Sequence, residues 1–307
     1  MSESGIHKVG VIGLGLMGRG IAEVAVSMGF DVLAIDVTDA RVEEGITFIE
    51  DALQRRSDGP GKPPAKSRLP LESGRKPGER VQGSTEIRSL LDRDVLIEAM
   101  VEDEGAKKEM IAAVARSGYV GLFVSNTSSI SITRLAGATP RPEKFMGMHF
   151  MNPVPVQAGC ELIRGRLTSD ETFSRIKAFS RELGKEPIVA GDGPGFGINR
   201  MFVPFLMEAV KVVEEGIMSC EDADKTTLCL GHKMGPITAL DYVGLDTALA
   251  IAGLLERELG PCYRVPDLLG KLVAAGFYGM KTGAGFYLWE QNKKTGVNPV
   301  VEQYRRK

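Results

Sequence analysis

The first third of the chain alternates between short apolar runs and segments with apolar residues at helical spacing. Lys8–Ile12 is a β-branched, apolar run of the kind that forms a buried parallel strand. A glycine-rich turn follows, and then Arg19–Met28 has the apolar spacing of a helix that Gly29 ends. Asp31–Ile35 is a second apolar run, closed by Asp36. The pattern therefore predicts a strand, a helix and a second strand within about 30 residues.

The same alternation continues to about residue 150. Asp94–Met100, Gly121–Ser125 and roughly Lys144–Met148 are predicted as further buried strands, and Lys107–Arg116 as a helix between the first two. Strands that alternate with helices on this scale indicate a parallel, doubly wound sheet, so we predict a Rossmann-type α/β domain. Ligands of such sheets bind beyond the carboxyl ends of the strands, and the residues that follow each strand are therefore candidates for a site.

Beyond about residue 190 the pattern contains helices and almost no strands. Ile198–Glu215 is a long amphipathic segment, and further helices are predicted at Asp246–Leu259 and Val265–Ala275. We therefore predict the Rossmann-type α/β domain over residues 1–190 and an all-α domain over residues 191–307.

The composition is that of an ordinary soluble globular protein, with 43% hydrophobic and 25% charged residues among 307. The formal net charge of −2 provides no positive field for nucleic acid. No apolar run approaches the roughly 18 residues that cross a membrane, and the first residues lack the layout of a signal peptide. The four cysteines (Cys160, Cys220, Cys229 and Cys262) form no C-x-x-C pair. This argues against a zinc site or a disulfide framework and favours reduced thiols in a cytoplasmic protein.

The turn after the first strand has the form of a dinucleotide-binding loop, made by Gly13, Leu14, Gly15, Leu16, Met17 and Gly18. The first glycine permits a tight turn, the second lets the backbone approach a pyrophosphate, and the third lets helix and strand pack closely. A carboxylate at Asp36 accepts hydrogen bonds from ribose hydroxyls and repels a 2′-phosphate, which favours NAD over NADP. The alternative is a tight turn with a helix-capping Asp and no ligand. The strand before, the helix after and the acid at the expected distance favour NAD.

His149 stands in the stretch MHFMNPVPV, ahead of two prolines that one valine separates. Proline cannot donate to a sheet ladder and pushes the preceding residue toward an extended backbone, so the strand is expected to end just before the histidine. The local pattern leaves two interpretations open. His149 is either a polar residue at a strand end or a reactive group at the cofactor side of the sheet.

Several motifs are similar to those of the L-3-hydroxyacyl-CoA dehydrogenases. HFMNPVPV at His149–Val156 resembles the HFFNPVP signature of that family, and SNTSS at Ser125–Ser129 and GFGINR at Gly195–Arg200 are also similar. Met234–Asp246 closely resembles the short-chain members, the 3-hydroxybutyryl-CoA dehydrogenases, and KTGAGFY at Lys281–Tyr287 matches their C-terminal motif. The resemblance covers nearly the whole chain in the right order, so the chain is identified as a member of this family.

The resemblance implies a role for each matching residue at the reaction centre. His149 matches the catalytic histidine, which takes the proton of the 3-hydroxyl group as the hydride passes to the nicotinamide. Glu161 follows at the spacing of the family and would hydrogen-bond the other ring nitrogen and stabilise the imidazolium. Ser128 and Asn199 match polar residues that hold the hydroxyl and the thioester carbonyl of the substrate. Asn152 matches a residue that lines the same pocket.

Other matching residues are implied at the cofactor. Glu102 and Lys107 match a pair that lies against the cofactor in relatives, and Asn126 of the SNTSS run is expected beside them. Lys281 matches a lysine that the family places at the NAD site from the second domain.

One segment departs from the family and from the alternation of strands and helices. Ser57–Gly83 is rich in Pro and Gly and carries more basic than acidic residues, so we expect most of it to be a mobile surface excursion. In relatives this region is a helical hairpin whose lysine meets the CoA phosphates, and Lys62 and Lys66 are therefore candidates only. Gln157–Cys160 also replaces the usual apolar and basic run, which affects the expected pocket wall.

The resemblance implies NAD-dependent oxidation of an (S)-3-hydroxyacyl-CoA, of short chain, to the 3-oxoacyl-CoA. Two alternatives stay open: the same chemistry on a hydroxy acid without CoA, such as a sugar acid, or a dinucleotide-binding relative that has lost catalysis. The expected partners are an acyl-CoA substrate and a second copy of the chain, paired through the helical domain. Neither nucleic acid nor a membrane is expected as a partner.

Overall fold

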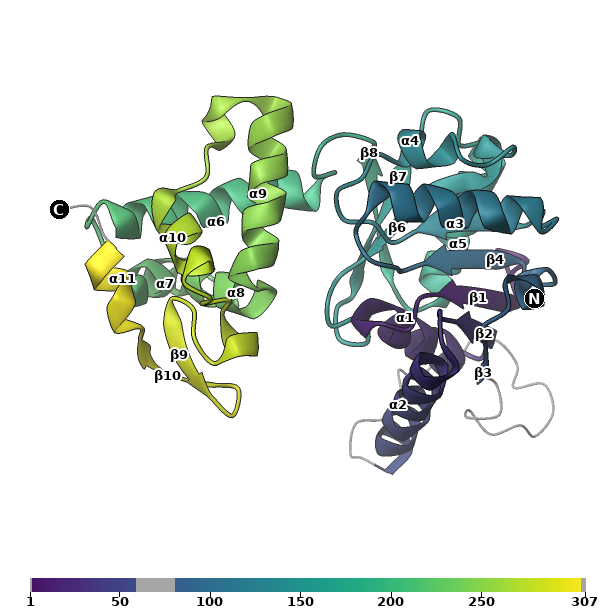
Figure 1. The fold of residues 1–307 in the computed structure, drawn as a ribbon, viewed down its shortest axis with the longest axis horizontal. Helices are drawn as coiled ribbons and strands as arrows, with labels where there is room; N and C mark the ends of the chain where they lie inside the picture. The colour runs from purple at the N-terminus through teal and green to yellow at the C-terminus, as the bar shows by residue number, and fades with distance from the viewer. Residues whose placement is uncertain (1, 59–80, 305–307) are drawn as a thin grey trace. The chain divides into compact units, whose positions relative to one another are not determined.

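The structure is a computed structural model that describes residues 2–58 and 81–304 and divides into two compact units, Met1–Gly193 and Pro194–Lys307 (Figure 1). Lys62 and Lys66, the candidate CoA contacts, lie outside the described residues.

The first unit is built on one eight-stranded sheet in the order β3-β2-β1-β4-β5-β6-β7-β8. Its strands are β1 (Lys8–Ile12), β2 (Asp31–Ile35), β3 (Val81–Ser84), β4 (Val95–Glu98), β5 (Leu122–Ser125), β6 (Phe145–Phe150), β7 (Gly159–Arg164) and β8 (Glu186–Gly191). All neighbours pair in parallel except β6 and β7, which are antiparallel. The order 3-2-1-4-5 is that of a doubly wound sheet, so the predicted Rossmann-type α/β fold is confirmed.

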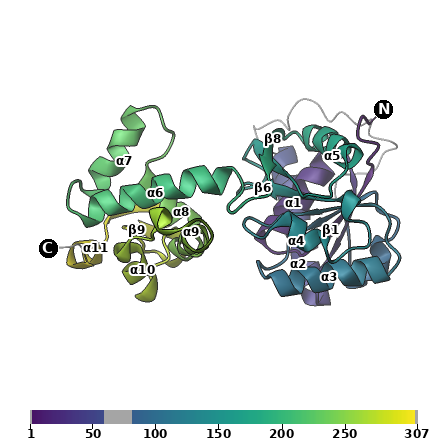
Figure 2. The same cartoon turned by 90° about the horizontal axis from the view of Figure 1, so that it is seen from above.

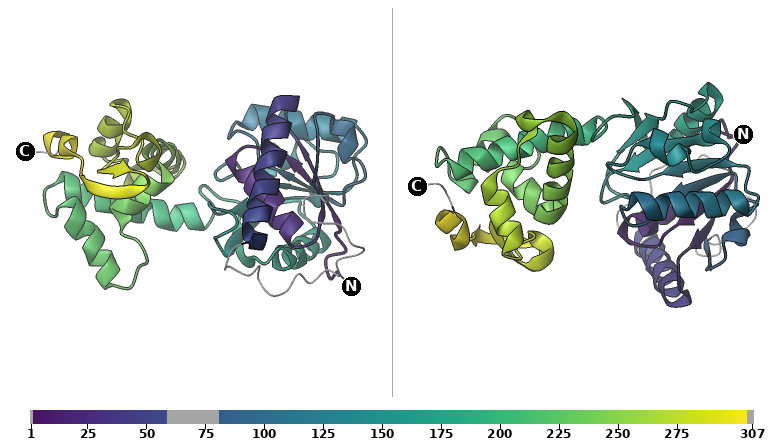
Figure 3. Two further views of the ribbon diagram at one scale, coloured as in Figure 1. Left: turned by 90° about the horizontal axis from the view of Figure 1, so that it is seen from below. Right: turned by 45° about the horizontal axis from the view of Figure 1, so that its top comes forward.

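Helices cover both faces of this sheet. α1 (Leu16–Ser27), α2 (Asp39–Asp58) and α5 (Asp170–Glu182) supply apolar residues to one core on one face. α3 (Glu104–Arg116) and α4 (Ile132–Ala136) lie on the other face. Figure 2 shows α5 and α3 on opposite sides of the strands, and Figure 3 gives two further views of these layers.

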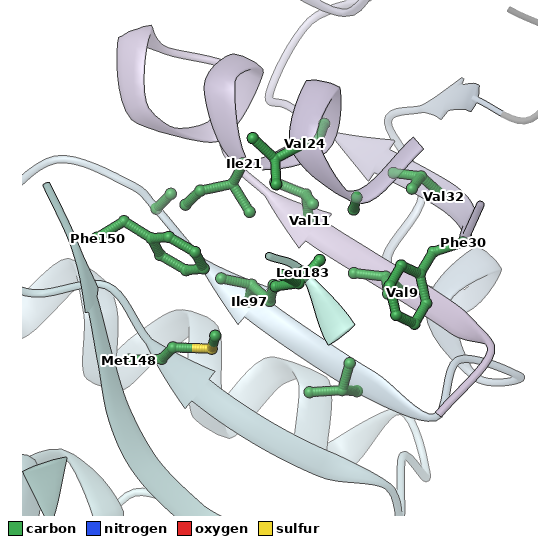
Figure 4. Packing of buried hydrophobic residues seen from close by; sticks show 14 of the residues in the cluster. Val9, Val11, Ile21, Val24, Phe30, Val32, Ile97, Met148, Phe150 and Leu183 are labelled. Atoms are coloured by element: carbon green, nitrogen blue, oxygen red, sulfur yellow. The ribbon is translucent and has the colours of Figure 1, made fainter. Parts of the chain in front are cut away.

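Strand β1 is apolar on both sides because both faces of the sheet are covered. Val9 and Val11 point into the core below α1, where Val11 lies near Ile21 and Val9 lies beside Phe30 (Figure 4). Gly10 faces the other side, where a Cβ atom would lie 2.3 Å from Leu96 Cδ2. Each fully buried aliphatic side chain contributes about 1.5–3 kcal/mol to stability, so this packing holds the glycine loop that follows β1.

The sheet extends further than the sequence predicts at two places. The strand expected to end at Met148 continues to Phe150 because it pairs with β7, a strand that the pattern does not predict. At the two ends of the expected surface excursion, α2 continues to Asp58 and β3 begins at Val81 and pairs in parallel with β2. Partners that are distant in the sequence decide these boundaries.

The second unit is helical apart from one hairpin. Its helices are α6 (Ile198–Glu214), α7 (Cys220–Cys229), α8 (Pro236–Val243), α9 (Leu245–Leu259), α10 (Asp267–Ala274) and α11 (Pro299–Tyr304). The prediction of an all-α domain lacks the hairpin of β9 (Tyr287–Glu290) and β10 (Lys293–Val297). Gln291 and Asn292 join these strands with φ of 49° and 63°, the left-handed conformation of a two-residue hairpin turn.

A buried carboxylate of α8 holds this hairpin to the helices. Asp241 accepts hydrogen bonds from the Phe286 and Tyr287 amides at 2.8 and 2.9 Å and from Trp289 Nε1 at 2.8 Å. The Tyr287 hydroxyl donates in turn to Asp224 of α7 at 2.8 Å. Burial raises the pKa of Asp241 to about 6. These contacts explain why a short strand pair forms within a helical unit.

In the part of the chain that the structure describes, no single helix is long and apolar enough to cross a membrane. α8 and α9 reach that length and composition only together, and they are bent by 101° where they meet.

Candidate active site at the carboxyl edge of the sheet

The glycine loop has the geometry that a dinucleotide requires. Gly13 has φ of +96°, a conformation that favours glycine, and a Cβ atom on Gly18 would lie 1.8 Å from the Gly13 oxygen. A Cβ atom on Gly15 would meet nothing within 4 Å, so the loop surface there is open. Helix α1 starts at this point without a side-chain cap and without an acidic residue in its first turn. Its first N–H groups and the positive end of its dipole suit a pyrophosphate.

Asp36 closes the loop from the end of β2. Its Oδ2 accepts from the Leu14 amide and its Oδ1 from the Val37 amide, both at 2.7 Å. The side chain is 9% exposed. A carboxylate oxygen can accept more than one hydrogen bond, so Asp36 can hold the loop and still receive ribose hydroxyls. The loop and the acid therefore fit an NAD molecule.

Glu102, beyond the end of β4, accepts several hydrogen bonds from the turn that follows β5. Its Oε1 accepts from Thr127 Oγ1 at 2.6 Å and from the Ser128 and Ser129 amides at 2.8 and 3.1 Å. The Ser128 hydroxyl also donates to this oxygen, at 3.0 Å. Burial raises the pKa of Glu102, but the Lys107 ammonium and these hydrogen bonds outweigh that effect, so the pKa lies below its usual value. Glu102 therefore stays a carboxylate that shapes the Ser128 turn.

Lys107 lies beneath Glu102 in a buried ion pair. Its Nζ is 2.5 Å from Glu98 Oε1 and 3.4 Å from Glu102 Oε2, and its side chain is 1% exposed. Glu98 also accepts from the Met100 amide at 2.7 Å and from Ser125 Oγ at 2.5 Å. The ammonium group is therefore buried between the two carboxylates, and the expected place of Lys107 at the cofactor stays a prediction.

His149 and Glu161 are direct partners across the antiparallel strands β6 and β7. Directly opposed residues project from the same face of a sheet, so two groups 12 positions apart in the chain come together. His149 Nδ1 lies 2.9 Å from Glu161 Oε2, with the glutamate fully buried and the histidine 13% exposed. When Nδ1 donates to the carboxylate, Nε2 carries the lone pair that can take a proton.

The loop between β6 and β7 is tied to the sheet and to α1. Asn126 Oδ1 accepts from the Phe150 amide at 2.8 Å, which joins the end of β5 to the end of β6. Lys185 donates to the Val154 and Gln157 carbonyl groups at 2.5 and 2.8 Å. Val154 packs so close to α1 that its Cβ would lie 3.1 Å from a Cβ atom on Gly20. The two prolines therefore belong to an anchored loop, and Asn152 is exposed on it.

Parallel strands place most of the expected residues of the first unit along one edge of the sheet. The loop Gly13–Gly18, Asp36, Glu102 and Ser128 follow the carboxyl ends of β1, β2, β4 and β5. His149 is near the carboxyl end of β6, which runs parallel to β5.

Two expected residues belong to the second unit. Asn199 is the second residue of α6. Lys281 pairs with Asp246, with its Nζ 2.6 Å from both carboxylate oxygens. Burial raises the pKa of Asp246, and the hydrogen bond from Lys281 and other interactions lower it below the usual value. The roles of Asn199 and Lys281 at the site stay predictions.

Two residues of this region are not among those that the sequence indicates. Glu98 is a carboxylate inside the otherwise apolar strand β4, and that misfit in the pattern is the signal that could have revealed it. Lys185 carries no such signal because only the folded loop supplies its two carbonyl partners.

Comparison with known proteins gives a consistent result along the chain. The family model for the NAD binding domain of 3-hydroxyacyl-CoA dehydrogenase matches residues 8–193, and the model for the C-terminal domain matches residues 195–289. A 3-hydroxybutyryl-CoA dehydrogenase from Bradyrhizobium diazoefficiens is 42% identical over 301 residues, 96% of this chain and 98% of that protein. A probable 3-hydroxybutyryl-CoA dehydrogenase from Deinococcus radiodurans is 42% identical over 91% of this chain and 99% of that protein. The crystal structure of (S)-3-hydroxybutyryl-CoA dehydrogenase from Ralstonia eutropha is similar with a TM-score of 0.84 and 39% identity, over 93% of this chain and 100% of that chain.

Proposed function

The chain belongs to the 3-hydroxyacyl-CoA dehydrogenase family, and we propose that it oxidises short-chain (S)-3-hydroxyacyl-CoA to 3-oxoacyl-CoA reversibly, with NAD as cofactor. The observation that carries the proposal is the His149–Glu161 pair at 2.9 Å, on the same sheet edge as the glycine loop. The names of the relatives from Bradyrhizobium and Ralstonia support a substrate of the 3-hydroxybutyryl-CoA type.

In this proposal the proton and the hydride leave the substrate by separate routes. Bound NAD supplies the hydride acceptor. His149 Nε2 takes the hydroxyl proton, and the buried carboxylate of Glu161 at Nδ1 stabilises the imidazolium that forms. The C3 hydrogen leaves as a hydride with both electrons of the C3–H bond. The electron pair of the former O–H bond then forms the carbonyl group. In the reverse direction His149 returns the proton to the carbonyl oxygen.

Ser128 is proposed to position the substrate hydroxyl. The Ser128 hydroxyl lies 3.0 Å from Glu102 Oε1. Because a serine hydroxyl hydrogen can rotate, it can also donate to the substrate oxygen, whose own proton goes to His149. Asn199 can donate through its amide and is the proposed partner of the carbonyl, and Asn152 is the proposed lining residue on the loop after β6.

Absorbance at 340 nm with acetoacetyl-CoA and NADH tests the proposed base. Removing a general base costs about 10²–10⁴-fold in rate, so we expect that loss in kcat for His149→Ala. His7→Ala is the matched control, because His7 is an exposed histidine of the same unit, next to the amino end of β1. Equal turnover by His149→Ala and His7→Ala would show that the base is wrongly assigned.

A substrate panel separates the proposed acyl-CoA activity from the alternatives. We expect turnover of a four-carbon 3-hydroxyacyl-CoA and a fall in kcat/KM as the acyl chain lengthens. Turnover of free hydroxy acids in preference to CoA thioesters would replace the substrate assignment, and NAD binding without turnover would indicate a non-catalytic relative.

We also propose that the protein is a cytoplasmic homodimer that pairs through its helical unit. Exposed apolar side chains on that unit support the pairing, among them Met201, which is 73% exposed, and Leu230, which is 76% exposed. The cysteines form no disulfide, which agrees with a reducing compartment. A concentration-independent monomer in sedimentation would contradict the dimer.

A further inference from the structure

Arg41 lies beside the acid that is expected to select the cofactor. It stands in the first turn of α2, with Nη1 3.7 Å from Asp36 Oδ1. The Asp36 side chain is 9% exposed, whereas that of Arg41 is 66% exposed. At 3.7 Å the pair is an ion pair beyond hydrogen-bond distance, so Asp36 leaves the N–H donors of the guanidinium to another group.

Asp36 and Arg41 are of the two residue types by which Rossmann-type sites distinguish NAD from NADP. In Rossmann-type sites an acid at the end of the second strand binds the ribose hydroxyls of NAD, whereas an arginine nearby binds the 2′-phosphate of NADP. Here both are present within six residues, and the arginine has the fork of donors that matches a phosphate. The carboxylate repels that phosphate, and the guanidinium attracts it.

The other charges near this position do not cancel the arginine. Asp39 begins α2 and is exposed, so solvent and salt screen its repulsion. The start of α2 also carries the positive end of a 20-residue helix, which favours an anion. Asp36 is thus the least exposed negative charge that opposes a 2′-phosphate here.

We propose that Arg41 is a specificity-determining residue that binds a 2′-phosphate group on the adenosine ribose, and that the Asp36 carboxylate masks it. The preference for NAD over NADP then depends on one carboxylate. This inference rests on the dinucleotide site of the proposed function and is independent of the acyl substrate.

Calorimetric affinities for two nicotinamide-free fragments, ADP and 2′,5′-ADP, test this inference. We expect Asp36→Ser to raise the affinity for 2′,5′-ADP relative to ADP by about tenfold, because a charged repulsion is removed. Adding Arg41→Ala should remove about tenfold of the affinity for 2′,5′-ADP and leave that for ADP within twofold. The gain of Asp36→Ser should shrink at 0.5 M salt, since the new contact is between exposed charges.

The controls separate a specific contact from general charge or from misfolding. Arg55 is exposed on the same helix, about 21 Å further along its axis, so Asp36→Ser with Arg55→Ala should keep the gain. Asp36→Asn retains an oxygen for the Leu14 amide and replaces Asp36→Ser if that variant does not fold.

The proposal is overturned if the double variant Asp36→Ser with Arg41→Ala binds 2′,5′-ADP as tightly as Asp36→Ser alone. It is also overturned if neither Asp36 variant gains affinity for 2′,5′-ADP. Because these fragments bind without turnover, failure here is distinct from failure of the wild-type protein to oxidise NADH with acetoacetyl-CoA.

Discussion

Replacing Lys107 by Met removes an ammonium group from a place that solvent does not reach. The Lys107 and Glu98 side chains are 1% and 0% exposed, and Nζ lies 2.5 Å from Oε1. Met has nearly the volume of Lys and fills the same space without a charge. The substitution therefore leaves the Glu98 carboxylate buried without its counter-ion.

The expected loss in the free energy of unfolding follows from the hydrogen bonds that Glu98 retains. Removing one partner of a buried ion pair costs about 3–5 kcal/mol. Glu98 still accepts from the Met100 amide at 2.7 Å and from Ser125 Oγ at 2.5 Å, so we expect the lower end, about 3 kcal/mol. For a unit of nearly 200 residues, 1 kcal/mol shifts Tm by about 2–4 °C, so the first unit should melt about 6–12 °C lower.

Differential scanning calorimetry combined with tryptophan fluorescence shows whether the shift in Tm belongs to the first unit. The chain has one tryptophan, Trp289, which is buried in the second unit. The calorimetric transition of the first unit should move, and the fluorescence transition should stay within about 2 °C of the wild type.

Two further variants isolate the charge. Glu98→Gln with Lys107→Met removes both charges and should recover most of the lost stability, because no unpaired ion remains. Glu98→Gln alone should cost less than Lys107→Met, because Lys107 keeps Glu102 at 3.4 Å. A Tm of Lys107→Met within 2 °C of the wild type would refute the reasoning. So would a double variant as unstable as Lys107→Met.

Further tests address the loop, the hairpin and the proposed base. Gly15→Ala should keep the wild-type Tm but weaken NAD binding by at least tenfold in calorimetry. Gly18→Ala should also lower Tm, because its Cβ would lie 1.8 Å from a backbone oxygen. Equal Tm values and NAD affinities of the two variants would contradict this expectation. Because burial raises the pKa of Asp241 to about 6, the folded state holds a proton there that the unfolded chain releases near pH 4, so its stabilising contribution is present at low pH and lost as pH rises from about 4 to 6. Urea unfolding followed by tryptophan fluorescence should show this loss, and Asp241→Asn should flatten it; an unchanged pH slope in the variant would exclude this group. Glu161→Gln should keep Tm within a few degrees but lower kcat by about 10²–10³-fold, because the imidazolium of His149 loses its carboxylate, and a kcat within threefold of the wild type would remove that role.

The sequence alone predicts the parts of the molecule that depend on local backbone conformation and on the periodicity of burial. The strand, the glycine loop, the first helix and Asp36 are contiguous, and each requires a residue type that is legible in the pattern, such as glycine at φ of +96° in position 13. The order of family motifs along the chain likewise identifies the fold and the family without coordinates. Helices α6, α9 and α10 of the second unit are predicted for the same reason, whereas α8 and α11 are not.

Only the tertiary structure decides which distant groups meet. The register of β6 against β7 places His149 opposite Glu161, and a shift of one residue would turn one of them to the other face. The buried pair of Glu98 and Lys107 joins a strand to a helix, so the local pattern around either residue does not predict the contact. In the same way, the β9–β10 hairpin depends on Asp241, which belongs to helix α8. Apolar periodicity records whether a side chain is buried, whereas the identity of its polar partner depends on contacts between segments that only the folded chain brings together.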